Sequence, residues 1–175
     1  MSGAAASGRD KVRRRLDGSW KMELGNVLLM PAFLYYVTGG SWVPSPGLGA
    51  FCLVPMCGLL LVGGWCWRAK ARAAAGDRSA LPGALALARR AQMSLLLLTI
   101  AAAGASLTDL LVTPLAAGTG DRVLAALAAG LAVLEYVNYY HRQLQHFDNP
   151  ADVRRLLRGE GFRESHLRAD LNRAG

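Results

Sequence analysis

Residues 48–67 read LGAFCLVPMCGLLLVGGWCW, a run of 20 residues without a charged side chain. A helix needs about 20 mainly apolar residues to cross the hydrocarbon core of a bilayer. A membrane β-strand would be shorter and would alternate polar and apolar residues, and this run does neither. The stretch therefore predicts a transmembrane helix.

Three further blocks of the chain have the same character and carry few charges. They lie at 22–43, 92–113 and 123–140, and Pro- and Gly-rich turns follow the first and third blocks of the chain. Such turns join neighbouring helices into hairpins. We therefore expect an all-α, polytopic membrane protein with four transmembrane helices in two hairpins, arranged as a four-helix bundle.

The composition supports the same class. Of the 175 residues, 53% are hydrophobic and 18% are charged, whereas soluble domains average about 25% charged residues. The net charge of +8 comes from three segments that hold 19 of the 20 Lys and Arg residues and leave Arg122 as the exception. Since cytoplasmic segments of membrane proteins retain Lys and Arg, both termini and the middle loop are predicted to be cytoplasmic.

This topology divides the chain into three regions. A basic cytoplasmic N-terminus covers 1–21, and the transmembrane domain covers 22–141 and includes a cytoplasmic loop at 68–91. A basic tail at 142–175 follows, with short helices expected at about 149–158 and 164–172 because of their caps and apolar positions.

The basic charge is explained by the topology and does not require nucleic acid as a partner. Basic residues beside a membrane are attracted to anionic lipids of the inner leaflet, by about 1 kcal/mol each. The architecture is similar to that of many small bacterial membrane proteins. This resemblance implies an integral protein of the bacterial plasma (inner) membrane, and the charge distribution predicts the N-in, C-in orientation.

Polar side chains inside the predicted spans are the candidate binding residues, because an ionisable group at mid-membrane costs roughly 2.5–3.5 kcal/mol. At 100° per residue, the fourth block places several polar groups on one face that descends toward the cytoplasm. The first block has two more at the same depth, three residues apart. The cluster predicted from these two blocks comprises Glu23, Asn26, Glu135, Asn138, Tyr139 and Arg142.

Two interpretations of this cluster stay open. Interhelical hydrogen bonds that fix the helix register would use the same residues. A proton or cation site open to the cytoplasm, or a polar pocket for a lipid head group or small ligand, is the functional alternative. Asp109 lies near the opposite end of its block, where a carboxylate can reach water or a neighbouring helix, so we expect no catalytic pair between Asp109 and Glu135.

Small residues and cysteines are interpreted as packing groups. Ala126 and Gly130 form a small-xxx-small pair that suits close packing inside the bundle or a homodimer seam. The three cysteines, all in 48–67, match no zinc spacing and an odd count does not suit a disulfide framework.

No motif of a catalytic or cofactor site is present in the sequence, so no cofactor is expected. The residues His141, His146, Asp148, Asp152 and His166 have the right types for a metal site. However, His141 and His146 are five residues apart and fall on different helix faces, so no metal is predicted.

The leading functional hypothesis is a non-catalytic accessory, assembly or regulatory component of a membrane complex, with another membrane protein as its partner. The first alternative is a homo-oligomeric transporter of protons, ions or small solutes that uses the face from Glu135 to Asn138. The second is a lipid-modifying enzyme at the interface, with His141, Asp148 or Asp152 in the site.

Overall fold

The computed structural model describes residues 2–37, 47–144, 154, 158 and 161–173, and in this part of the chain the regular elements are helices. In chain order they are α1 (Ser2–Val37), α2 (Leu48–Ala74), α3 (Leu81–Leu111), α4 (Thr119–Tyr140) and α6 (His166–Arg173). The all-α prediction is confirmed for the described residues.

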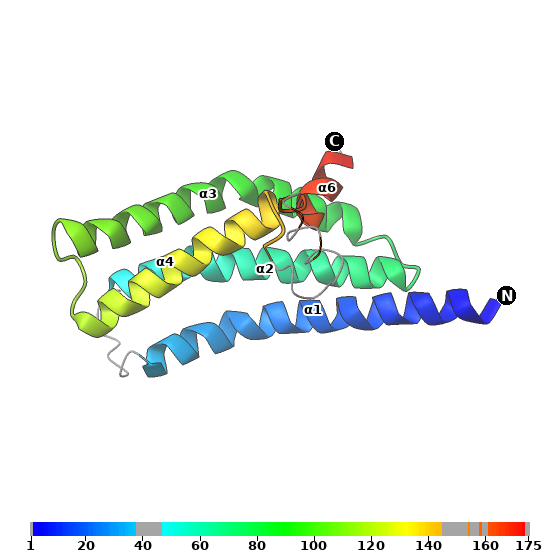
Figure 1. The fold of residues 1–175 in the computed structure, drawn as a ribbon, viewed down its shortest axis with the longest axis horizontal. Helices are drawn as coiled ribbons and strands as arrows, with labels where there is room; N and C mark the ends of the chain where they lie inside the picture. Colours follow the sequence, from blue (N-terminus) through cyan, green and yellow to red (C-terminus); the bar gives the residue numbers. More distant parts are fainter. Residues whose placement is uncertain (1, 38–46, 145–153, 155–157, 159–160, 174–175) are drawn as a thin grey trace.

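The four long helices lie roughly side by side, with α2 at the centre (Figure 1). Helix α2 packs against α1, α3 and α4, and α3 also packs against α4. The short α6 contacts α4 and α3 at the end of the bundle where α2 ends and α3 begins. Both ends of the chain lie toward this same end of the molecule.

Three helices, α2, α3 and α4, are long and apolar enough to cross a membrane. They match three of the four predicted blocks. Helix α1 does not reach the same apolar content within its described residues, because its first half is polar and the end of the predicted block, 38–43, lies outside the described part. One continuous helix thus covers most of the predicted N-terminal region and most of the first predicted span.

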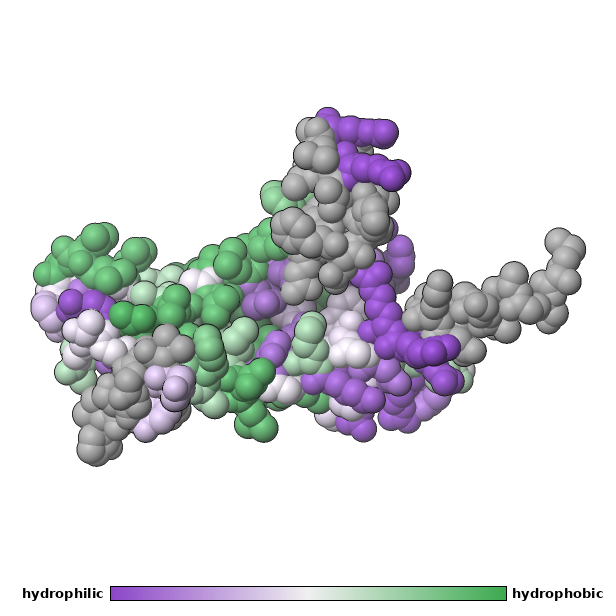
Figure 2. Space-filling model, turned by 60° about the horizontal axis from the view of Figure 1, so that its bottom comes forward, coloured by the Kyte–Doolittle hydropathy of each residue, from purple (hydrophilic) through white to green (hydrophobic). Residues whose placement is uncertain are grey.

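Large apolar side chains point outward over much of the bundle. Leu28 is 78% exposed, Leu97 is 60% exposed and Val112 is 78% exposed. Figure 2 shows hydrophobic residues gathered over one part of the molecule and hydrophilic residues over the end that carries the termini. An outward apolar surface of this extent is typical of a protein whose surroundings are lipid.

Most of the predicted cytoplasmic segment at 68–91 is helical. Helix α2 continues to Ala74 and α3 begins at Leu81, so only residues 75–80 connect them. The charges in this stretch suggested a loop, but alanine, arginine and leucine have high helix propensity and continue both helices beyond the apolar blocks. Gly76 then supplies the turn with a φ of 105°.

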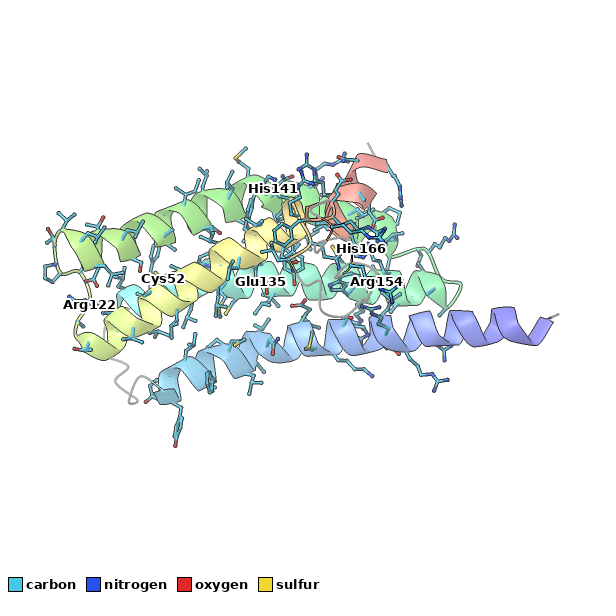
Figure 3. The ribbon with its side chains drawn as sticks, viewed as in Figure 1. Cys52, Arg122, Glu135, His141, Arg154 and His166 are labelled. Atoms are coloured by element: carbon cyan, nitrogen blue, oxygen red, sulfur yellow. The ribbon has the colours of Figure 1, made fainter. Side chains whose placement is uncertain are left out.

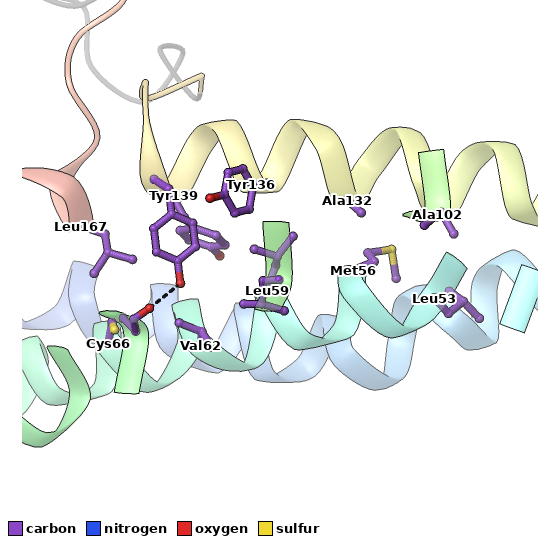
Figure 4. Packing of buried hydrophobic residues seen from close by; sticks show 14 of the residues in the cluster. Leu53, Met56, Leu59, Val62, Cys66, Ala102, Ala132, Tyr136, Tyr139 and Leu167 are labelled. Carbon is purple, nitrogen blue, oxygen red and sulfur yellow. Dashed lines mark hydrogen bonds between the residues drawn. The ribbon is translucent and has the colours of Figure 1, made fainter. Parts of the chain in front are cut away.

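The core depends on small residues at the helix contacts. Ala125, Ala128, Ala129 and Ala132 form the buried stripe of α4, and Figure 4 shows Ala132 and Ala102 close to Met56 of α2. The small-xxx-small pair predicted from the sequence lies on a different face. Gly130 is exposed and a Cβ there would meet nothing within 4 Å, so this glycine does not pack inside the bundle.

The tail folds back onto the end of the bundle. Leu167 and Leu171 of α6 are buried, and the backbone N–H of Ser165 donates to the carbonyl of His141 at 3.3 Å. The Lys70 ammonium of α2 pairs with Asp170 at 2.5 Å. The predicted helix at 164–172 is therefore present as α6, whereas most of the helix expected at 149–158 lies outside the described residues.

Candidate functional site

Two adjacent glycines of α2, Gly63 and Gly64, determine how closely α1 and α4 approach it. A Cβ built on Gly63 would lie 2.3 Å from the Tyr139 hydroxyl oxygen of α4. A Cβ built on Gly64 would lie 2.9 Å from Leu24 Cδ2 and 3.3 Å from Glu23 Cβ, both of α1. Since only glycine leaves this space, the pair forms a platform on which side chains of α1 and α4 converge.

The Glu23 carboxyl and the Tyr139 hydroxyl face each other above this platform. Both side chains are almost fully buried, at 6% and 5% exposed. The hydroxyl completes no hydrogen bond of ordinary geometry with any described residue. A buried polar atom without a partner costs about 1–3 kcal/mol and therefore requires an explanation.

Glu135 lies one turn before Tyr139 on α4 and is half-buried. Its charge acts on Glu23, so the two carboxyl groups, from α4 and α1, belong to one electrostatic cluster. The Asn138 amide nitrogen donates to Glu135 Oε2 at 3.4 Å, and Asn138 Oδ1 accepts from the Leu144 backbone N–H at 2.9 Å. The second bond fixes the orientation of the amide, because it directs the NH₂ group toward the carboxylate.

The other two residues of the predicted cluster behave differently. The Arg142 guanidinium bonds the carbonyl of Phe162 at 3.0 Å, and its backbone bridges to Glu164, so it holds the tail and not the carboxylates. Asn26 is half-buried one turn along α1 from Glu23. Four of the six predicted residues, Glu23, Glu135, Asn138 and Tyr139, are thus brought together.

Neither Glu23 nor Glu135 has a basic group within 4 Å among the residues that the structure describes. A basic side chain of α2 lies against aromatic rings of α1 and α2. The Arg68 guanidinium lies 5.5 Å from the ring centre of Trp20 and 5.9 Å from that of Trp65. This arrangement is typical of the membrane–water interface, where amphipathic rings and basic groups gather.

A second polar cluster lies at the opposite end of the bundle, and sequence reasoning missed most of it. Asp109 of α3 accepts the backbone N–H groups of Leu115 and Ala116 at 2.7 and 2.8 Å and pairs with Arg122 at 2.8 Å. Figure 3 shows Arg122 at this end, far from His141 and Glu135. Asp109 therefore closes the α3–α4 turn, which is a structural role.

Asp121 of α4 was not identified from the sequence at all. Its carboxylate accepts the backbone N–H groups of Leu48 at 3.1 Å and Gly49 at 2.8 Å, and also that of Ala117 at 3.0 Å. It thereby caps the N-terminus of α2, where N–H groups lack intrahelical partners. The sequence feature that corresponds to this contact is the glycine on each side of Leu48. A Cβ on Gly47 would lie 2.7 Å from the Asp121 carboxylate, so the carboxylate can approach the helix start only at a glycine.

The cysteines of α2 contact three different places on neighbouring helices. The thiol of Cys52 lies 3.6 Å from the Ala102 carbonyl of α3, that of Cys57 lies 3.8 Å from the Val27 carbonyl of α1, and that of Cys66 lies 3.7 Å from a carbonyl of α3. Each is a free thiol that acts as a small packing group and weak donor.

The histidines that suggested a metal site are partly described. His141 lies 5.6 Å from the Tyr136 ring, measured between ring centres, and His166 lies 6.1 Å from the Trp67 ring. In the described part of the chain, no group of three or more His, Cys, Asp or Glu side chains is placed to hold a metal ion. His146, Asp148 and Asp152 lie outside the described residues.

Comparison of the chain with protein-family models, with curated proteins and with solved structures finds no match. The described residues form a helical protein with three helices apolar enough to cross a membrane, and one buried and one half-buried carboxyl group lie near a pair of glycines.

Proposed function

We propose that this is a small integral membrane protein that acts as a non-catalytic accessory, assembly or regulatory component of a membrane complex. In this proposal α1 is a fourth span, and the basic end of the bundle faces the cytoplasm of a bacterium, beside anionic lipids of the plasma membrane. The side-by-side, antiparallel course of α1 and α2 supports the fourth span, because α1 then crosses the same apolar layer as its neighbour (Figure 1).

The observation that carries the accessory role is the position of α1 in the bundle. Among the described residues it packs along α2, and its Glu23 side chain also reaches Tyr139 of α4. Its outer face presents Leu29, 64% exposed, within the predicted span. Toward the N-terminus the same helix presents the exposed Arg13, Arg14 and Arg15. A partner that meets α1 would therefore contact an apolar face inside the membrane and a basic face below it.

Photo-crosslinking from single positions tests this role in cells that express the protein at its native level. A benzoyl-phenylalanine at Leu29 and another at Arg14 are expected to capture the same second protein. The matched control is Leu97 of α3, which is as exposed as Leu29 but lies on another helix. Equal capture from all three positions, or none from α1, would contradict the proposal. Capture of a second copy of this chain would favour the transport alternative instead.

Transport of protons or ions by a homo-oligomer is the second candidate, and the assembled cluster of Glu23, Glu135 and Tyr139 favours it specifically. Flux into liposomes that depends on Glu135 would support this candidate. The comparison is between Glu135→Gln and Glu164→Gln, which makes the same change in the exposed tail. Equal flux in both variants would count against transport.

A further inference from the structure

We infer that Glu23, Glu135 and the Tyr139 hydroxyl form a binding site for one monovalent positive charge, either a proton or an alkali metal cation. The inference specifies the chemistry of the cluster that favours the transport candidate. It does not depend on a protein partner or on flux, because binding alone is claimed. Three features of the described residues support it.

The first feature is the unbalanced charge. The charge of the Glu135 carboxylate on α4 reaches the Glu23 carboxyl on α1. No Lys or Arg of the described chain pairs with either of them. In a medium of low dielectric constant two neighbouring carboxylates do not both stay ionised without compensation, and one bound positive charge removes the repulsion between them.

The second feature is the buried hydroxyl of Tyr139, which is 5% exposed and meets the Glu23 carboxyl without completing a hydrogen bond of ordinary geometry. A buried phenol normally finds a hydrogen-bond partner. Here the ring tip is placed against Gly63, and the hydroxyl completes no bond of ordinary geometry within the described residues. A cation between the carboxylates would take the phenol oxygen as a ligand, and a shared proton would leave a carboxyl oxygen free to accept from it.

The third feature is the set of neighbouring groups. The charged or titratable groups that act on Tyr139 are Glu23 from α1, Glu135 from α4 and the Cys66 thiol from α2. Asn138 donates to Glu135 and its own oxygen is already used by Leu144, so the amide orients the carboxylate and leaves the charge uncompensated. The donors that remain are carboxylate and phenol oxygens, which suit a hard cation.

Ligand-dependent stability of the purified full chain in detergent micelles tests the site. Binding to the folded state raises the unfolding temperature. One series replaces N-methylglucamine chloride by sodium or potassium chloride at constant ionic strength and alkaline pH. A second series varies pH in N-methylglucamine chloride alone. Stabilisation in the first series identifies an alkali cation, and stabilisation confined to the second identifies a proton.

Three variants and one control decide the assignment. We expect Glu23→Gln and Glu135→Gln each to weaken the stabilising titration by about tenfold or more, since one of two charges that hold the ligand is lost. Tyr139→Phe keeps the ring over Gly63 and removes only the oxygen. It should weaken alkali-cation binding, or shift the pH midpoint, while the stability without ligand stays the same or rises. Glu164→Gln should titrate like the original chain. Titrations unchanged in the two glutamate variants would overturn the site.

A second experiment uses the unaltered protein, because a substituted chain that does not fold would give no titration. Dicyclohexylcarbodiimide reacts with protonated carboxyl groups in apolar surroundings, and peptide mass spectrometry locates the adduct. We expect modification of Glu23 or Glu135, with protection by the stabilising ion or by alkaline pH. Absence of modification at both residues would overturn the site. Binding in these assays without flux in liposomes would contradict the transport candidate and leave the site standing.

Discussion

Replacement of Asp121 by alanine should detach the start of α2 from the start of α4. The carboxylate accepts three backbone N–H groups, those of Leu48 at 3.1 Å, Gly49 at 2.8 Å and Ala117 at 3.0 Å. Two of these belong to the first turn of α2, which has no other acceptor for them within its own helix.

The expected magnitude follows from these three bonds. Hydrogen bonds to a charged group contribute about 1.5–3 kcal/mol each when buried, and the loss of a helix cap costs about 0.5–2 kcal/mol. Asp121 is 8% exposed but lies near a helix end, where water can replace part of the loss. We therefore expect Asp121→Ala to lower the free energy of unfolding by about 2–4 kcal/mol. Asp121→Asn, which keeps one acceptor oxygen, should cost about 1 kcal/mol.

Unfolding by dodecyl sulfate in mixed micelles, followed by circular dichroism, measures the free energy. Hydrogen exchange of the amides at 48 and 49 reports the location of the damage, since these N–H groups lose their acceptor. Glu164→Ala is the control, because its partly exposed carboxylate should contribute less than about 1 kcal/mol. An Asp121→Ala chain as stable as the control, with unchanged exchange at 48 and 49, would refute the reasoning.

Three further predictions concern the platform, the α2–α3 turn and the tail. Gly63→Ala places a methyl group 2.3 Å from the Tyr139 hydroxyl oxygen and should lower the free energy of unfolding by about 1–3 kcal/mol in the same assay. The control Gly130→Ala has open space around the new methyl group and should be neutral or stabilising. Equal free energies of unfolding for the two variants would contradict the close approach of α4 to Gly63. Hydrogen bonds from Ser79 and from the Arg72 guanidinium lower the pKa of Asp77 to about 2. The ionised carboxylate therefore stabilises the α2–α3 turn fully above the ordinary carboxyl pKa, and this stabilisation is lost as the pH falls toward 2. Asp77→Asn should remove that acid dependence of proteolysis at the turn, and an unchanged profile would contradict it. Ser165→Ala removes the hydroxyl that donates to the Tyr139 carbonyl at the end of α4. The free energy of unfolding should fall by about 1 kcal/mol, and hydrogen exchange in 165–173 should become faster. Unaltered exchange in 165–173 would show that α6 docks on the bundle without this hydrogen bond.

The helices could be predicted from the sequence where apolar blocks are long. The block at 48–67 begins at the same residue as α2, and the block at 123–140 ends at the same residue as α4. The extensions of α2 and α3 beyond the blocks could not be predicted from hydropathy, because the helix continues through charged residues once the apolar part ends. Helix propensity over 68–74 and over 84–91 was the signal that would have found them.

In the candidate site, the residues that share one helix face could be predicted, whereas contacts between distant parts of the chain could not. The 3.6-residue period placed Glu135, Asn138 and Tyr139 on one face, and a shared depth linked them to Glu23. The same face also contained Arg142, but the helix ends at Tyr140, so that side chain turns to the tail. Pairings across distant parts of the chain, such as that of Asp121 with Gly49, depend on which helices become neighbours, and a single sequence does not contain this.

We propose that α1 crosses the membrane beside α2, with Glu23 in the bilayer and the basic end of the bundle in the cytoplasm. Substituted-cysteine labelling tests it most directly, in a chain whose native cysteines are replaced by alanine. Single cysteines at Arg14, Ser45, Arg78 and Ala117 are treated with a membrane-impermeant maleimide in intact spheroplasts. We expect labelling at Ser45 and Ala117 alone, with Arg14 and Arg78 labelled only after the membrane is opened. Labelling of Arg14 and Ser45 from the same side would contradict it, because α1 would then lie on the membrane and not across it.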